Sequence, residues 1–243
     1  MAVGSFLNVC IYRLPQSISL IRPGSMCPGC RTKITFYDNV PVASYLWLRG
    51  RCRHCGTAIS PRYPLVELIS GLFAVAVFAR HGLSWEGLIV YALIAALLVI
   101  TFIDIDHQII PDLITYPGIV VGFLASLAVG QITYIESLIG IILGGGVLLM
   151  VAWGYYLVTK KEGMGGGDIK LLAMIGAFLG WKGVIFTIFV GSAIGSAVGM
   201  AIALRTEQGR KLPIPFGPFL SLGALLFLFF GPQIISLYVR ILR

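Results

Sequence analysis

The chain has 243 residues, of which 58% are hydrophobic and 12% charged, and its mean hydropathy is +0.93. Soluble domains are about half apolar and about a quarter charged, so this composition excludes an ordinary soluble globular protein. The net charge of +8 would suggest nucleic-acid binding in a soluble protein. Because basic residues also collect in the cytoplasmic loops of membrane proteins, we expect a lipid bilayer and no nucleic acid as a partner.

The chain begins with a short apolar segment, MAVGSFLNVCIY. As a helix of about 1.5 Å per residue it is too short to cross a bilayer. It lacks the basic start of a signal peptide. We therefore interpret residues 1–12 as an interfacial piece or as the remnant of a first transmembrane helix.

Residues 13–62 are polar and contain two C-x-x-C pairs, Cys27–Cys30 and Cys52–Cys55. Two such pairs can complete a tetrahedral thiolate site, so we predict a cytoplasmic domain with four cysteines that bind a structural zinc ion. Two disulfides are an alternative that a reducing cytoplasm disfavours. A thioredoxin-like redox pair is another, although it would not occur twice. His54 lies within a knuckle and is not expected to be a ligand.

Residues 63–243 are expected to form the transmembrane domain, because they contain successive apolar stretches, most of them near the length of a bilayer span. The predicted fold is an all-α polytopic membrane protein with seven to eight transmembrane helices and a small zinc-ribbon-like domain. The predicted spans are residues 64–79, 87–104, 113–129, 137–158, 169–180, 183–204 and 217–239.

The distribution of basic residues predicts the orientation of these spans. If residues 13–62 are cytoplasmic, alternation places all but four of the 18 Lys and Arg residues on the inner side, as the positive-inside rule requires. The four on the outer side are Arg80, Lys182, Arg240 and Arg243. The links at 105–112 and 159–168 then lie on the same, cytoplasmic side.

Those two links carry the acidic residues of interest. Carboxylates beside spanning helices are rare and usually functional. Asp104 closes the apolar stretch LLVITFID, where the negative end of a helix disfavours an acid, so we expect a role other than capping. Asp106, two residues further, would point roughly away from it, and Asp112 after Pro111 could cap the next helix.

Asp168 follows a run of three glycines, Gly165 to Gly167. An aspartate there could cap the following helix, but capping does not require three glycines. Glycine permits close backbone approach, so we predict that an extended peptide lies there with its scissile bond facing Asp168. Two carboxylates in a partly dehydrated site share one proton, which is the arrangement that aspartyl proteolysis needs. We predict Asp104 and Asp168 as this pair.

The blocks VGSFLNVCIYRLP, CPGC, CRHC, PLVE, FIDIDHQIIPD, KEGMGGGDIKLLAMIGAFLG and PIPFGPFL occur in this order. Together they resemble the prepilin peptidase (type IV leader peptidase) family of GxGD-class intramembrane aspartyl proteases. The resemblance implies that Asp104 and Asp168 are catalytic and that Gly165 and Gly167 are the motif glycines. Asp106 and Asp112 would have supporting roles.

By that resemblance, the enzyme would lie in the bacterial inner membrane with its active site at the cytoplasmic side. It would remove the leader of type IV prepilins or type II secretion pseudopilins after a glycine. It would then methylate the new N-terminus with S-adenosylmethionine, an activity linked to the cysteine domain. Alternatives are a related GxGD protease without methyltransferase activity, a proton-coupled transporter, and an assembly protein that keeps only the fold.

Overall fold

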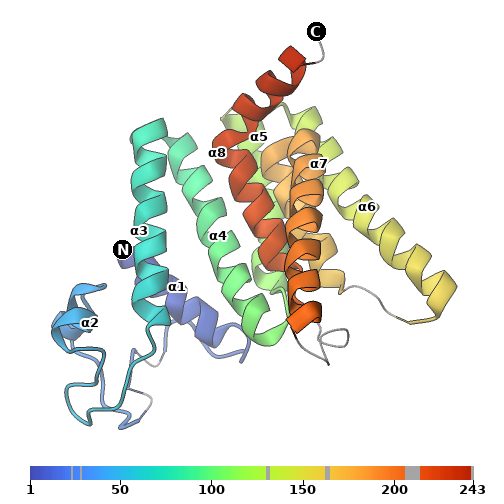
Figure 1. Ribbon diagram of the computed structural model, residues 1–243. Coiled ribbons are helices and arrows are strands. Elements are labelled where there is room, and N and C mark those ends of the chain that lie inside the picture. Colours follow the sequence, from blue (N-terminus) through green and yellow to red (C-terminus); the bar gives the residue numbers. More distant parts are fainter. Residues whose placement is uncertain (23, 28, 130–131, 162–164, 206–213, 242–243) are drawn as a thin grey trace. The chain divides into compact units, whose positions relative to one another are not determined.

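The computed structural model describes residues 1–22, 24–27, 29–129, 132–161, 165–205 and 214–241. This part of the chain is predominantly helical, with two isolated β-bridges within residues 26–58 (Figure 1). The elements are α1 (Ala2–Arg13), η1 (Phe36–Asn39), α2 (Ala43–Trp47), α3 (Arg62–His81), α4 (Trp85–His107), α5 (Asp112–Ala128), α6 (Tyr134–Thr159), α7 (Gly166–Arg205) and α8 (Gly217–Ile241).

Five helices of the described chain are long and apolar enough to cross a membrane: α3, α4, α6, α7 and, over residues 217–234, α8. Helix α5 is a shorter apolar helix. Helix α7 is divided in two at Gly180, whose φ of 67° and ψ of −177° are not helical. This break separates the predicted spans 169–180 and 183–204. An all-α polytopic membrane fold is therefore confirmed.

The chain forms two compact units, Met1–Val99 and Ile100–Arg243. In the first unit, α1 packs against α3. The two helices approach closely at Gly4, where a Cβ atom would lie 2.7 Å from the Cα of Glu67. The side-chain amide of Asn8 also donates a hydrogen bond to the carbonyl of Tyr63 over 3.0 Å. Residues 1–12 thus form a helix held by α3, while the predicted domain limits at 12 and 62 stay predictions.

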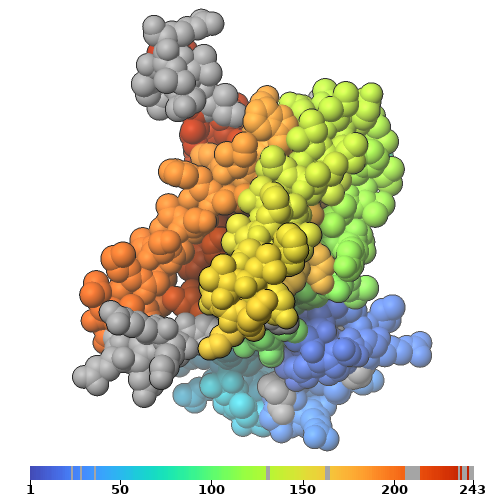
Figure 2. All heavy atoms as spheres, turned by 90° about the vertical axis from the view of Figure 1, so that its right-hand side faces the viewer, coloured from blue at the N-terminus to red at the C-terminus, as the bar shows by residue number. Residues whose placement is uncertain are grey.

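Helix α7 lies at the centre of the second unit, where it packs against α5, α6 and α8. Its first half is almost completely buried, with Leu171, Leu172, Met174 and Ile175 inaccessible to solvent. Figure 2 shows α6, in lime to yellow, beside the orange α7 on one face. The first turn of this buried segment carries Asp168, so the packing around α7 fixes the backbone of one predicted catalytic residue.

Glycines bring the helices of this unit into backbone contact. A Cβ atom at Gly144 of α6 would lie 2.5 Å from the carbonyl oxygen of Leu172, and one at Gly223 of α8 would lie 2.9 Å from that of Thr187. Small residues permit such approach between membrane helices, whose association depends on packing and hydrogen bonds. The buried hydroxyl of Ser137 adds a hydrogen bond of 2.8 Å to the carbonyl of Ala177.

Candidate active site and metal centre

Asp104 lies in the last turn of α4 and is 4% exposed. Its Oδ2 accepts a hydrogen bond of 2.9 Å from the backbone N–H of Gly217, the first residue of α8. A helix N-terminus carries partial positive charge and unpaired N–H groups. The start of α8 therefore offsets the unfavourable position of an aspartate at the end of α4.

Asp168 is the third residue of α7 and is partly exposed. It therefore lies inside the helix and not at the cap position. Its neighbour Gly167 contacts Ile110, because a Cβ atom at Gly167 would lie 2.9 Å from the Cβ of Ile110. Ile110 also contacts Gly217, where a Cβ atom would lie 3.3 Å from the Ile110 Cδ1. One side chain thus connects the residue before Asp168 with the residue that binds Asp104.

These contacts bring together the end of α4 and the starts of α7 and α8. Asp104 and Asp168, which lie at these helix ends, are therefore in the same region of the second unit. One of the pair is buried and the other is partly exposed. Such a pair can hold one proton between them and activate a water molecule, provided that a substrate carbonyl is placed beside them.

The other acids of this region do not join the pair. Asp106 is exposed, as expected from its position two residues after Asp104. Asp112 is the first residue of α5, whose N-cap position is occupied by Pro111, so the predicted capping role of Asp112 is not observed. Instead, Asp112 forms an ion pair with Lys170 of α7. Lys170 also lies 5.4 Å from the centre of the Tyr116 ring.

The three glycines before Asp168 differ in their surroundings. Only Gly167 is confined by a neighbouring side chain, that of Ile110. A Cβ atom at Gly166 would meet nothing within 4 Å, and at Gly165 it would meet only the backbone of Gly167, at 4.0 Å. The preceding residues 162–164 lie outside the described chain. Internal packing therefore accounts for Gly167 alone.

Sequence reasoning missed two residues of this site, Gly217 and Ile110. The block PIPFGPFL contains Gly217, although its first residue, Pro213, lies outside the described chain. Nothing in the sequence indicates that its N–H bonds a side chain 113 positions away. Ile110 sits between two acids in FIDIDHQIIPD and reads there as an ordinary apolar residue.

In the first unit, the two cysteine pairs adopt the same backbone structure. The N–H of Cys27 bonds the carbonyl of Thr32, and that of Cys52 bonds the carbonyl of Thr57. The N–H of Arg31 donates a hydrogen bond to the carbonyl of Cys27, four residues earlier, and the N–H of Gly56 donates one to the carbonyl of Cys52 in the same way. Both Arg31 and Gly56 have left-handed φ values, 57° and 70°. Two matching knuckles are therefore formed.

The four cysteine sulfurs lie within 4.8 Å of one another. The Cys27 and Cys55 sulfurs are 3.7 Å apart, which is close to the roughly 3.8 Å between two thiolates bound to one tetrahedral zinc at about 2.3 Å. All five cysteines of the chain are free. Hydrogen bonds with Thr57 lower the pKa of the Cys55 thiol to about 6, whereas the pKa of Cys27, which is buried beside the other thiols, is raised to about 11. The thiolate is the form that binds metals. The cluster can hold a metal ion, and His54 is not part of it.

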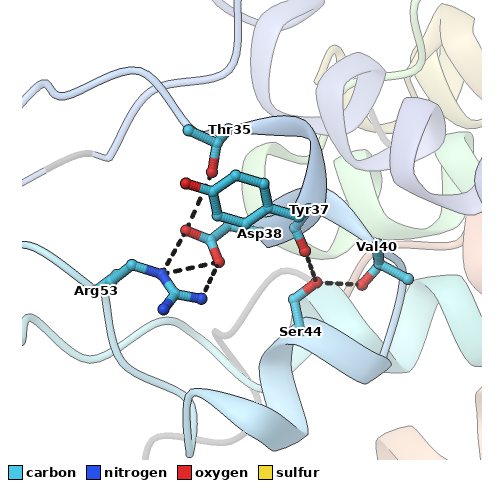
Figure 3. Close-up of polar contacts among 6 residues, drawn as sticks. All are labelled: Thr35, Tyr37, Asp38, Val40, Ser44 and Arg53. Carbon is cyan, nitrogen blue, oxygen red and sulfur yellow. Dashed lines mark hydrogen bonds and ion pairs between the residues drawn. The ribbon is translucent and has the colours of Figure 1, made fainter.

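A polar network fixes the second knuckle to the segment before α2 (Figure 3). The guanidinium of Arg53 donates hydrogen bonds to both carboxylate oxygens of Asp38, at 2.6 to 3.1 Å. These bonds hold the pKa of Asp38 below its usual value. Arg53 also lies 5.6 Å from the centre of the Tyr37 ring, and the Thr35 hydroxyl donates to Asp38 over 3.2 Å.

Comparison with known proteins places both sites in one family. Residues 1–81 match the bacterial peptidase A24 N-terminal domain, and residues 91–200 match the type IV leader peptidase family. The chain belongs to the type IV leader peptidase family. The second match includes Asp104 and Asp168, and the first includes all four clustered cysteines.

Several relatives align with the chain along nearly its whole length. Proteins named "Prepilin leader peptidase/N-methyltransferase" are 38% identical in Aeromonas hydrophila and 37% in Stutzerimonas stutzeri. The first alignment covers 98% of this chain and 91% of the relative, and the second covers 100% and 92%. A Pseudomonas aeruginosa protein of the same name is 36% identical, and the alignment covers 99% of this chain and 91% of that protein. No solved structure matches significantly.

Proposed function

We propose that this protein is a membrane aspartyl endopeptidase in which Asp104 and Asp168 form the catalytic pair. The observation that carries the proposal is their convergence at one end of the second unit. There the N–H of Gly217 binds Asp104, and Ile110 contacts both Gly217 and Gly167. Both aspartates lie within residues 91–200, which match the type IV leader peptidase family, and this supports the same assignment.

In the proposed reaction, the ionised carboxylate removes a proton from water, which attacks the carbonyl carbon of the scissile peptide bond. The protonated carboxyl donates its proton toward the carbonyl oxygen. As the tetrahedral intermediate collapses, the carboxylate that has given up its proton takes one from a hydroxyl of the intermediate. The other carboxyl passes the proton that it took from water to the nitrogen, and the C–N bond breaks. The N–H of Gly217 keeps the Asp104 carboxylate in one orientation throughout.

We propose type IV prepilins or type II secretion pseudopilins as substrates, cleaved after a glycine on the cytoplasmic side of a bacterial inner membrane. The relatives' name contains "Prepilin leader peptidase". The basic leader of such a precursor would be attracted by the acids of this region over about a Debye length. The open backbone at Gly165 and Gly166 provides space for an extended peptide.

We further propose that the enzyme methylates the new N-terminal amine with S-adenosylmethionine as the methyl donor, as the second half of the relatives' name indicates. Cys27, Cys30, Cys52 and Cys55 would hold a structural zinc ion, which their sulfur spacing fits. Four thiolates close the coordination sphere of zinc. The metal would therefore stabilise the domain and take no part in cleavage.

The test uses the purified full-length enzyme, a prepilin and S-adenosylmethionine, with the product weighed by mass spectrometry. We expect a product that has lost its leader and gained a methyl group. The Asp104→Asn and Asp168→Asn variants should each lose cleavage while remaining inserted in the membrane. Asp106→Asn is the matched control, because its side chain is exposed two residues away. Full processing by either variant of the pair would refute the mechanism.

A further inference from the structure

The short helix α2 and the residues after it present an exposed surface, the α2 patch, made of Leu46, Trp47, Arg49 and Arg51. Trp47 is 82% exposed and Leu46 is 69% exposed. The preceding Tyr45 instead folds back on the turn, since a Cβ atom at Gly50 would lie 2.9 Å from its ring. Two large adjacent apolar side chains are thus left outside the fold, although hiding them from water would be favourable.

The charge next to these side chains is positive and uncompensated. Residues 13–62 contain eight Lys and Arg residues and a single acid, Asp38. Arg53 already binds both carboxylate oxygens of Asp38. Arg49 and Arg51 are exposed and form no ion pair with any described residue. The α2 patch therefore suits an anionic partner and would repel a basic leader peptide.

A contact between the turn before α2 and helix α3 indicates at which level along α3 the α2 patch lies. The N–H of Val42, just before α2, donates a hydrogen bond of 2.9 Å to the Glu67 carboxylate, which is almost fully buried. Val42 has a φ of 61°, an unfavourable value for a β-branched residue, so this contact holds a strained turn. Glu67 lies five residues inside the membrane-spanning α3, about 7.5 Å from Arg62. Residues 43–47 form α2, whose rise of about 1.5 Å per residue keeps Trp47 close to Val42. Trp47 therefore lies near the end of α3 that begins at Arg62.

We propose that the α2 patch docks on the anionic phospholipid surface of the bilayer that α3 spans. Trp47 and Leu46 enter the interfacial region, where tryptophan is enriched in membrane proteins. Arg49 and Arg51 bind headgroup phosphates. The cysteine cluster, whose second pair begins at Cys52, is thereby held against the membrane surface. This inference concerns the first unit and does not depend on the proposed peptidase activity.

The experiment uses full-length protein in which Trp85, Trp153 and Trp181 are replaced by Phe, so that Trp47 is the only tryptophan and can be excited selectively over the ten tyrosines. The protein is placed in nanodiscs of phosphatidylcholine, with or without phosphatidylglycerol, in which one lipid at a time carries brominated acyl chains. We expect bromine to quench Trp47, with brominated phosphatidylglycerol quenching more strongly, and we expect little quenching by aqueous acrylamide.

Replacing Arg49 and Arg51 by Glu should reduce the preference for phosphatidylglycerol by about fivefold per arginine. The matched control, Arg22→Glu with Lys33→Glu, makes the same change of charge at two exposed residues of the same domain and should retain the preference. A thermal unfolding curve shows that each variant is folded. Strong acrylamide quenching without bromine quenching would overturn the proposal. Shielding from both quenchers would also overturn it, because a protein surface, such as a second copy of the chain, would then cover Trp47.

Discussion

At the scale of single residues, Ile110 determines how close the two predicted catalytic segments come. It contacts Gly167 on α7 and Gly217 on α8, and each glycine is adjacent to or bonded to one aspartate. A Cβ atom at either glycine would force a neighbouring side chain to move. Packing against Ile110 therefore accounts for Gly167, and packing against the Asp104 carboxylate accounts for Gly217.

The first prediction compares two adjacent glycines. Gly167→Ala should lower kcat of leader cleavage by about 100-fold, because displacing Ile110 moves the Asp168 segment and a shift of about 1 Å can have that effect. Gly166→Ala, where a Cβ atom meets nothing, should leave kcat unchanged in an assay with a purified prepilin. A raised KM in Gly166→Ala alone would indicate that the open glycine contacts the substrate. Equal kcat in both variants would contradict the packing account.

The second prediction concerns the partner of Asp104. In Gly217→Ala the new Cβ atom would lie 2.6 Å from Asp104 Oδ2, so the carboxylate must rotate away from the N–H that binds it. We expect cleavage to fall by about 100-fold, while insertion in the membrane is unchanged. Gly231→Ala, further along α8 and 3.0 Å from the nearest ring atom of Phe227, is the control. Normal cleavage by Gly217→Ala would show that this hydrogen bond is dispensable.

The catalytic role of Asp104 and Asp168 stays a prediction. The sequence supports it, because acids beside apolar spans are unusual and the two stand in recognisable motifs. It was insufficient for Gly217 and Ile110. Their importance comes from contacts between segments far apart in the chain, and glycine or isoleucine has no chemistry that marks such a contact in advance. The alternative that Asp112 caps α5 is not observed, since Pro111 holds the N-cap position and Lys170 binds the acid, while its supporting role stays a prediction.

At the scale of elements, glycines set the distance between α6 and α7. Gly140 and Gly176 are in direct backbone contact, and Gly144 lies against Leu172. The sequence predicted spans in both regions and a break between 180 and 183, and the break occurs at Gly180. It did not indicate which glycines face a neighbouring helix, because α6 has apolar residues on all sides and its pattern distinguishes no packing face.

The third prediction tests the contact between α6 and α7 by replacing two glycines of α6. Gly144→Ala should destabilise the protein by about 1–3 kcal/mol, because its Cβ would lie 2.5 Å from a backbone oxygen that cannot move freely. Gly146→Ala, two residues along, has open space and should keep or raise the thermal unfolding temperature, since alanine favours the helix. The measurement is thermal unfolding in detergent micelles. The same unfolding temperature for both variants would mean that the helices separate easily.

At the scale of the whole molecule, the two predicted sites belong to different compact units. The cysteine cluster lies within Met1–Val99, and Asp104, Ile110, Asp168 and Gly217 all lie within Ile100–Arg243. The residues that orient the carboxylates are thus supplied entirely by the second unit. Sequence reasoning also assigns the two kinds of site to different segments by composition, and their roles stay predictions. It could not show that α1 and α3 belong to the same unit as the cysteines.

This division predicts that the two activities can be separated. Replacing Cys52 and Cys55 by Ser removes half of the thiolate set, so the knuckles should lose the metal and their structure. Methylation should then fall far more than leader cleavage, because Gly217, which binds Asp104, and Ile110, which contacts Gly167, both belong to the other unit. Mass spectrometry of the prepilin product measures both reactions in one sample, and metal analysis of the purified variant confirms zinc loss.

Cys10→Ser, which replaces a buried thiol outside the cluster, is the control. Equal and complete loss of both activities would show instead that the second unit needs the metal-bound domain in order to fold.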